Sequence, residues 1–153
     1  MPVLYNPPNS ERSWSSGFNR HLLDSTLDSS RGWCPRQPNG HQWLQFDNVD
    51  PSLRITGLVF QRRRDYAQWV KTYRYSYYTP GVASTGWSSA LNTGMDRIGW
   101  WVPADRIYDS PLPTVLTGGT RLRIQALTWH HFPCMRIGFK ATQGSAQDAK
   151  VYW

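Results

Sequence analysis

Three consecutive arginines at positions 62–64 are the most conspicuous candidates for chemistry in this chain. A guanidinium group presents a planar fork of N–H donors that matches carboxylates and phosphates, and it also stacks on aromatic rings. After the run, the segment at 68–78 (QWVKTYRYSYY) alternates aromatic with polar residues. The run is therefore either a binding surface for an acidic partner or a solvated stretch at the end of a strand.

The overall charge favours an acidic partner. The 153 residues include 17 Lys and Arg against 10 Asp and Glu, for a net charge of +7 and a pI near 9.8. Arginine is much the commoner of the two cations, and it suits contacts with carboxylates, phosphates or acidic protein surfaces. Net charge bears on association and solubility rather than on the fold.

Catalytic and metal-binding patterns are missing from the sequence. The chain lacks GxSxG, HExxH, GxGxxG and the P-loop, and its single glutamate is Glu11. His130, His131 and Cys134 do not have a usual zinc spacing, and no acidic calcium loop is visible. We therefore expect a protein that is not an enzyme and that holds no metal or cofactor.

The N-terminus and the cysteines indicate a cytoplasmic protein. The opening residues, MPVLYNPPNSERSW, lack the charged and apolar regions of a signal peptide, and no apolar run is long enough to span a membrane. The two cysteines, Cys34 and Cys134, are then expected to be reduced thiols.

Short strands account for most of the chain. Runs rich in aliphatic and aromatic residues are separated by turns that contain many of the 12 glycines and 11 prolines. A helical turn or two is expected only within residues 15–28. Many short strands of this kind predict an all-β sandwich or barrel. We expect an extended arm at 1–13, the sandwich domain at 14–143 and a C-terminal tail at 144–153.

Alternation within three runs predicts which side chains are buried. Apolar residues lie on one face of residues 68–78, 121–127 and 134–140, and polar or basic residues lie on the other. If these strands are neighbours, their outer faces form a basic stripe of Arg74, Arg121, Arg123 and Arg136.

Three motifs resemble the discoidin domain, also called the coagulation factor V/VIII type C domain. They are HQWLQFD, ITGLVFQRRRDYAQWVKTYRYSYY and LTWHHFPCMRIGF, and the similarity extends from about residue 15 to 140. The resemblance implies an antiparallel eight-stranded β-sandwich of jelly-roll type. It also implies that Arg63 and Asp65 form an ion pair that braces a loop, and that three tryptophans are buried: Trp43, Trp69 and Trp129.

Departures from this family are also visible. The family usually joins cysteines at the two ends of the domain, whereas Cys134 falls inside the last core strand, so we expect the disulfide to be absent. Arg62 occupies a position where the family usually has glycine, and residues 98–119 look like an insertion. Because neighbouring side chains in an extended segment point in opposite directions, either Trp100 or Trp101 is expected to be available to a partner.

The first functional hypothesis is a structural adaptor that docks onto an acidic partner in a larger intracellular assembly. The basic surface of such an adaptor would suit an acidic microtubule in a cilium or axoneme. The residues proposed to contact this partner are Arg62, Arg64, Trp100, Trp101, Arg121, Arg123 and Arg136.

The second hypothesis follows from the resemblance and is a lectin-like protein that binds galactose-type sugars. The residues proposed for the sugar site are Trp33, His41, Arg63, Trp87 and His131. A third hypothesis, binding to nucleic acid or to an anionic membrane, is less favoured. Both of these interactions would weaken steeply with salt.

Overall fold

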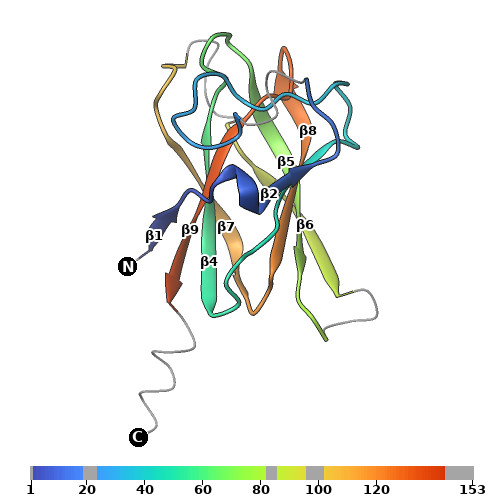
Figure 1. The fold of residues 1–153 in the computed structure, drawn as a ribbon, viewed down its shortest axis with the longest axis vertical. Coiled ribbons are helices and arrows are strands. Elements are labelled where there is room, and N and C mark those ends of the chain that lie inside the picture. The colour runs from blue at the N-terminus through green and yellow to red at the C-terminus, as the bar shows by residue number, and fades with distance from the viewer. Residues whose placement is uncertain (1, 19–23, 82–85, 96–101, 144–153) are drawn as a thin grey trace, which may run out of the picture.

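The fold consists of two antiparallel β-sheets packed face to face (Figure 1). The computed structural model describes residues 2–18, 24–81, 86–95 and 102–143. The four-stranded sheet, in the order β1-β9-β4-β7, contains Val3–Tyr5, Arg136–Gln143, Leu53–Gln61 and Tyr108–Thr117. The five-stranded sheet, in the order β2-β3-β8-β5-β6, contains Arg12–Trp14, Trp43–Phe46, Arg121–His130, Trp69–Tyr78 and Trp87–Thr93.

This architecture confirms the predicted antiparallel sandwich. The described residues form nine strands, whereas eight were expected, because the extended N-terminal segment adds β1 alongside β9 and β2 alongside β3. Val3 lies opposite Ala141, and Arg12 lies opposite Phe46. A short 3₁₀ turn at Asn9–Glu11 joins the two strands. The C-terminal tail expected at 144–153 lies outside the described residues.

The core lies between the sheets and follows the predicted alternation. On β5 the four aromatics Trp69, Tyr73, Tyr75 and Tyr77 are buried, and on β8 the same holds for Leu122, Ile124 and Ala126. Rings from opposite sheets meet here: Phe46 of β3 packs edge-on against Phe139 of β9, with 5.3 Å between the ring centroids. Burial of these large rings supplies most of the apolar stabilisation.

Two expectations about burial and helix differ from the structure. Trp69 is buried as predicted. Trp43 is partly exposed because it lies on the outer face of the five-stranded sheet beneath Arg123, and Trp129 packs against the core but is only partly buried. The described parts of residues 15–28 contain no helix, and Leu27 packs into the core through a turn. Within the ranges that the structure describes, no helix is long and apolar enough to cross a membrane.

Arg136 does not belong to the predicted basic stripe. Arg74, Arg121 and Arg123 lie on neighbouring strands β5 and β8, but Arg136 lies on β9 in the other sheet. Its side chain is also completely buried. The stripe on the five-stranded sheet therefore has three arginines rather than four.

Candidate functional site

Four connecting segments gather at one end of the sandwich, at the top of Figure 1. They are residues 24–36, the β4–β5 loop at 62–68, residues 102–107 and the β8–β9 loop at 131–135. We call this the loop end. Two arginines and a disulfide hold these segments together.

The first of these arginines, Arg136, donates hydrogen bonds to three segments. Its Nε donates to the Arg62 carbonyl at 3.0 Å, its Nη1 to the Ser29 carbonyl at 2.9 Å, and its Nη2 to the Ala104 carbonyl at 2.6 Å. Nη1 also lies 3.3 Å from a carboxylate oxygen of Asp105. Burial lowers the pKa of Arg136, and the neighbouring Asp105 opposes that shift. The prediction that Arg136 contacts a partner is therefore wrong, since its donors are used inside the domain.

Arg62 has the same role within the β4–β5 loop. Its Nε donates to the Val102 carbonyl at 2.8 Å, and its Nη1 donates to the carbonyls of Arg63 at 2.6 Å and Tyr66 at 2.7 Å. These bonds curl the loop around the guanidinium and fasten it to the 102–107 segment. Arg62 was predicted to be a partner contact; its side chain is partly buried and bound to backbone of its own domain, and the partner contact stays a prediction.

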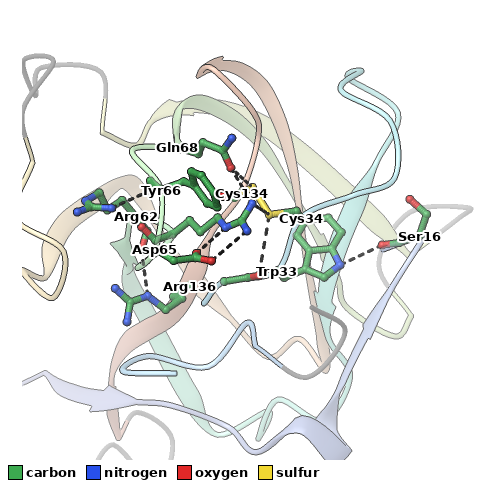
Figure 2. Close-up of a disulfide and its surroundings, with 11 residues drawn as sticks. Ser16, Trp33, Cys34, Arg62, Asp65, Tyr66, Gln68, Cys134 and Arg136 are labelled. Atoms are coloured by element: carbon green, nitrogen blue, oxygen red, sulfur yellow. Dashed lines mark hydrogen bonds and ion pairs between the residues drawn. A yellow bond between two sulfur atoms is a disulfide. The ribbon is translucent and has the colours of Figure 1, made fainter. Parts of the chain in front are cut away.

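A disulfide between Cys34 and Cys134 joins the first of these segments to the β8–β9 loop (Figure 2). The bridge spans 100 residues of sequence, and the Cα atoms are 4.3 Å apart. Next to it, Trp33 and Met135 exchange backbone hydrogen bonds of 3.0 and 2.9 Å. The expectations of reduced thiols and of an absent disulfide are therefore wrong. Disulfides of this kind are typical of oxidising compartments, so the cytoplasmic expectation loses its chemical argument.

Arg63 lies next to the disulfide, with its Nη1 3.8 Å from Cys34 Sγ. It forms a bidentate ion pair with Asp65, through contacts of 2.6 and 3.1 Å, which confirms the predicted brace. Its guanidinium carbon also lies 4.4 Å from the centre of the Tyr66 ring. Such a cation–π contact orients the ring. Tyr66 is held by this contact, yet 58% of its surface is exposed.

A second charged pair lies at the same end of the sandwich. Arg64 Nε is 3.6 Å from Asp105, and the two side chains are 50% and 54% exposed. The backbone N–H of Arg64 also donates to the Arg31 carbonyl at 2.6 Å, so the loop is fixed on both sides. We call this exposed set the loop platform: Arg63, Arg64, Asp65, Tyr66 and Asp105. It presents one aromatic ring beside both hydrogen-bond donors and acceptors.

The sequence analysis named only part of the loop platform. Arg63 and Arg64 were candidates, but Tyr66 and Asp105 were missed. A tyrosine placed in the polar segment between two predicted strands was the available signal for Tyr66. Asp105 had no such signal, because it lies about 40 residues further along the chain and the fold brings it to the platform through contacts with Gln61, Arg64 and Arg136.

Of the five residues predicted for a sugar site, Trp33, Arg63 and His131 lie at the loop end, and His41 and Trp87 lie elsewhere. Trp33 is only 1% exposed, and its Nε1 donates to the Ser16 carbonyl at 3.0 Å, so its proposed stacking on sugar is wrong. His131 is exposed at the loop end. His41 is exposed in the segment that precedes β3. The residue before it, Gly40, lies near Ala126 of β8. Trp87 begins β6 opposite Tyr78, at the other end of the sandwich.

The structure places only some of the residues that were predicted to contact a partner. Trp100 and Trp101 lie outside the described residues. Arg121 is exposed and Arg123 is partly buried on the outer face of the five-stranded sheet, away from the loop platform. In the portion of the chain that the structure describes, no group of three His, Cys, Asp or Glu residues is placed to hold a metal ion.

Comparison with known families and structures identifies the class of domain. The F5/8 type C domain family matches residues 9–139. The chain therefore belongs to this family, as its motifs predicted. Domains of the family are commonly carbohydrate- or ligand-binding modules and are generally non-catalytic.

Solved structures with the same fold are distant in sequence. Discoidin II from Dictyostelium discoideum superposes with a TM-score of 0.64 at 17% identity, over 85% of this chain and 53% of that one. This chain thus spans about half the length of discoidin II. The family 32 CBM of C. perfringens NanJ, solved with galactose, has a TM-score of 0.61 at 15% identity and covers 92% and 99% of the two chains. The CBM32 of AlyQ, solved with 4,5-unsaturated mannuronic acid, has a TM-score of 0.57 at 13% identity and covers 90% and 97%.

Proposed function

We propose that this chain is a non-catalytic carbohydrate-binding domain and that the loop platform is its sugar site. The observation that carries the proposal is the exposed Tyr66 ring, held by Arg63 in the same loop that carries the exposed Arg64, which in turn pairs with Asp105. Membership of a family of binding modules supports it. The galactose complex of the NanJ domain, which shares the fold, supports a galactose-type ligand as the first candidate.

Each group of the platform has a role in this proposal. The Tyr66 ring stacks on the apolar face of a pyranose, and its hydroxyl stays in water. Arg64 donates hydrogen bonds to sugar hydroxyls, and Asp65 and Asp105 accept them. Arg63 is already bonded within the loop, so it positions Tyr66 rather than contacting sugar.

Rigidity of the loop end also favours this function. The disulfide and the bonds of Arg62 and Arg136 fix the platform before any ligand arrives. A site that is already ordered loses less conformational entropy on binding, so a small ligand with few contacts can still be retained.

The adaptor hypothesis is not carried forward. It depended on a missing disulfide, a missing signal peptide, Arg-rich outer faces and the insertion at 98–119, and the structure contains the disulfide and buries Arg136. The ciliary and microtubule context has no remaining argument of its own. A binding module is the class that the family and the exposed platform support together.

The experiment is a glycan array followed by calorimetry with the best ligand, on the wild type and on Tyr66→Ala. Removal of the ring is expected to weaken binding by about tenfold, roughly what loss of one stacked aromatic costs. Tyr66→Phe keeps the ring and is expected to bind within about twofold of wild type.

Leu91→Ala is the matched control, because Leu91 is 60% exposed on β6, far from the platform. An array without signal from a folded protein would overturn the proposed function. Retention of full affinity by Tyr66→Ala would overturn the assignment of the site.

A further inference from the structure

The outer face of the five-stranded sheet carries a second unusual cluster. Its five strands contain Arg12, Lys71, Arg74, Arg121 and Arg123 but neither Asp nor Glu. Arg12 points into the domain, and three arginines remain on the outer face. In the portion of the chain described here, Arg74 and Arg121 are not paired with any carboxylate. Asp47, directly after β3, acts electrostatically on Arg123, so among the described residues the positive charge without a paired carboxylate is that of Arg74 and Arg121. A surface with such charge attracts an anionic partner.

The arginines follow a regular spacing across two strands. Arg121 and Arg123 are two residues apart on β8, so they point to the same side. The next position in this row is Gln125, and it lies opposite Arg74 of β5. Two residues of an antiparallel strand span about 7 Å. Arg121, Arg123 and Arg74 therefore lie at three successive positions about 7 Å apart along the strand direction.

Aromatic rings fill the space between these cations. The Arg123 guanidinium lies over the rings of Trp43 and Trp87, at 4.0 and 5.1 Å from their centres. Arg121 lies 5.1 Å from the ring centre of Tyr78, which in turn lies 5.3 Å from that of Trp87. Gln45 accepts a hydrogen bond of 2.9 Å from Arg123 Nε. The cluster is therefore held in place by strands β3, β8, β5 and β6 together.

We propose that this face binds a linear acidic polysaccharide, with its carboxylates or sulfates facing Arg121, Arg123 and Arg74. A polymer that carries an anionic group on every repeat can place several of these groups against the row of cations, and each guanidinium offers a fork to one anionic group. This surface is separate from the loop platform and does not depend on it.

Other polyanions fit the face less well. A single-stranded nucleic acid binds largely by stacking its bases on aromatic rings, but guanidinium groups already cover a face of Trp43, Tyr78 and Trp87. The centre of a protein–protein interface is depleted of charge, whereas the centre of this face is arginine. Leu91 is the large exposed apolar side chain of the sheet, and it lies on the edge strand β6.

The test is calorimetry with polygalacturonate oligomers at low salt, on the full chain. The matched ligand is the methyl-esterified oligomer, which has the same sugars without charge. Wild type is expected to bind the acid form at least about tenfold more tightly, and added salt is expected to weaken binding. Arg74→Gln with Arg121→Gln is expected to weaken it by about tenfold, since each exposed ion pair contributes a few-fold.

The control variant is Arg36→Gln with Arg106→Gln, which removes the same charge from exposed arginines elsewhere. It is expected to bind within about twofold of wild type. The proposal is overturned if both double variants bind alike, if the methyl ester binds as tightly as the acid, or if oligo-dT or poly-glutamate binds more tightly than polygalacturonate. Tyr66→Ala, which tests the loop platform, is expected to leave this binding unchanged, so failure of one site is distinguishable from failure of the other.

Discussion

At the scale of single residues, arginine has two distinct uses in this domain. Arg12, Arg62 and Arg136 donate to backbone carbonyls and fasten loops to the sandwich. Arg12 is only 4% exposed, and its Nη1 donates to the Ile137 carbonyl at 2.7 Å and the Ser25 carbonyl at 2.9 Å. Burial lowers its pKa to about 9, so it remains charged at neutral pH. Arg74 and Arg121, in contrast, face solvent.

Arg136→Gln is expected to destabilise the domain by about 3 kcal/mol, because the shorter amide leaves buried carbonyls of three segments without donors. Urea unfolding, followed by tryptophan fluorescence, measures the change. Arg74→Gln removes an exposed arginine of the same charge and is expected to change stability by less than about 0.5 kcal/mol. Equal unfolding midpoints for the two variants would contradict the internal role of Arg136.

The buried hydroxyl of Tyr73 is expected to make the stability of the domain depend on alkaline pH. This hydroxyl lies 2.7 Å from Ser110 Oγ and accepts a hydrogen bond from Asn92 at 2.9 Å. Burial raises the pKa of Tyr73 to about 12, against an ordinary value of 10.0. Between these two values the unfolded chain loses the proton first, so the stability that Tyr73 contributes falls as pH rises from about 10 to about 12.

Thermal melts at pH 9, 10 and 11 test this sign. The melting temperature is expected to fall across the series, and Tyr73→Phe is expected to fall less steeply. Burial also raises the pKa of Tyr75 and Tyr77, so the variant keeps part of the slope. A slope identical in the variant would show that the phenol of Tyr73 is not the group responsible.

At the scale of elements, the loop end is a set of segments joined across long sequence distances. Gln61 adds one more link, since its Nε2 donates to Asp28 Oδ1 and to the Asp105 carbonyl, both at 2.9 Å. The disulfide is the covalent link in this set. Closing a loop of that length restricts the unfolded chain.

Loss of the disulfide is expected to cost about 4 kcal/mol, in line with closure of a loop of about 100 residues. The measurement is urea unfolding of the wild type with and without a phosphine reductant, alongside Cys34→Ser with Cys134→Ser. The double variant is expected to be insensitive to the reductant. Rapid alkylation of both thiols in the native wild type, without reductant, would contradict the bridge.

The sequence predicted strands and faces well because β-structure leaves a local, two-residue period. The buried aromatics of β5 and the apolar side of β8 follow directly from it. This period also predicted that Arg136 points to the other face of the strand from Met135 and Ile137. That orientation agrees with the hydrogen bonds of Arg136 to loop carbonyls. The local pattern could not predict which segments cover this outer side, because residues 29 and 104 come from distant parts of the chain. The disulfide was missed for the same reason, since its two loops meet only in the folded sandwich.

At the scale of the whole molecule, charge is distributed unevenly. Ion pairs among the described residues, such as Arg63 with Asp65 and Lys140 with Asp109, lie at the loop end and on the four-stranded sheet. The five-stranded sheet has cations without carboxylates. Retention on a cation-exchange resin depends on this local distribution of charge as well as on the net charge.

Cation-exchange chromatography is therefore expected to separate two variants of equal net charge. Arg74→Gln with Arg121→Gln removes charge from the positive face and is expected to elute at lower salt than Arg36→Gln with Arg106→Gln. Both remain folded by circular dichroism, because all four side chains are exposed. Co-elution of the two would mean that the outer face does not dominate the field of the protein.

The pairing of β1 with β9 has a practical consequence. Val3 lies opposite Ala141, so the chain enters and leaves the sandwich side by side (Figure 1). Strand β9 begins at the loop end with Arg136 and runs away from it. A tether attached before Val3 or after Gln143 would therefore hold the domain by its far edge, and a sensor chip loaded in this way would present the Tyr66 ring to the sample.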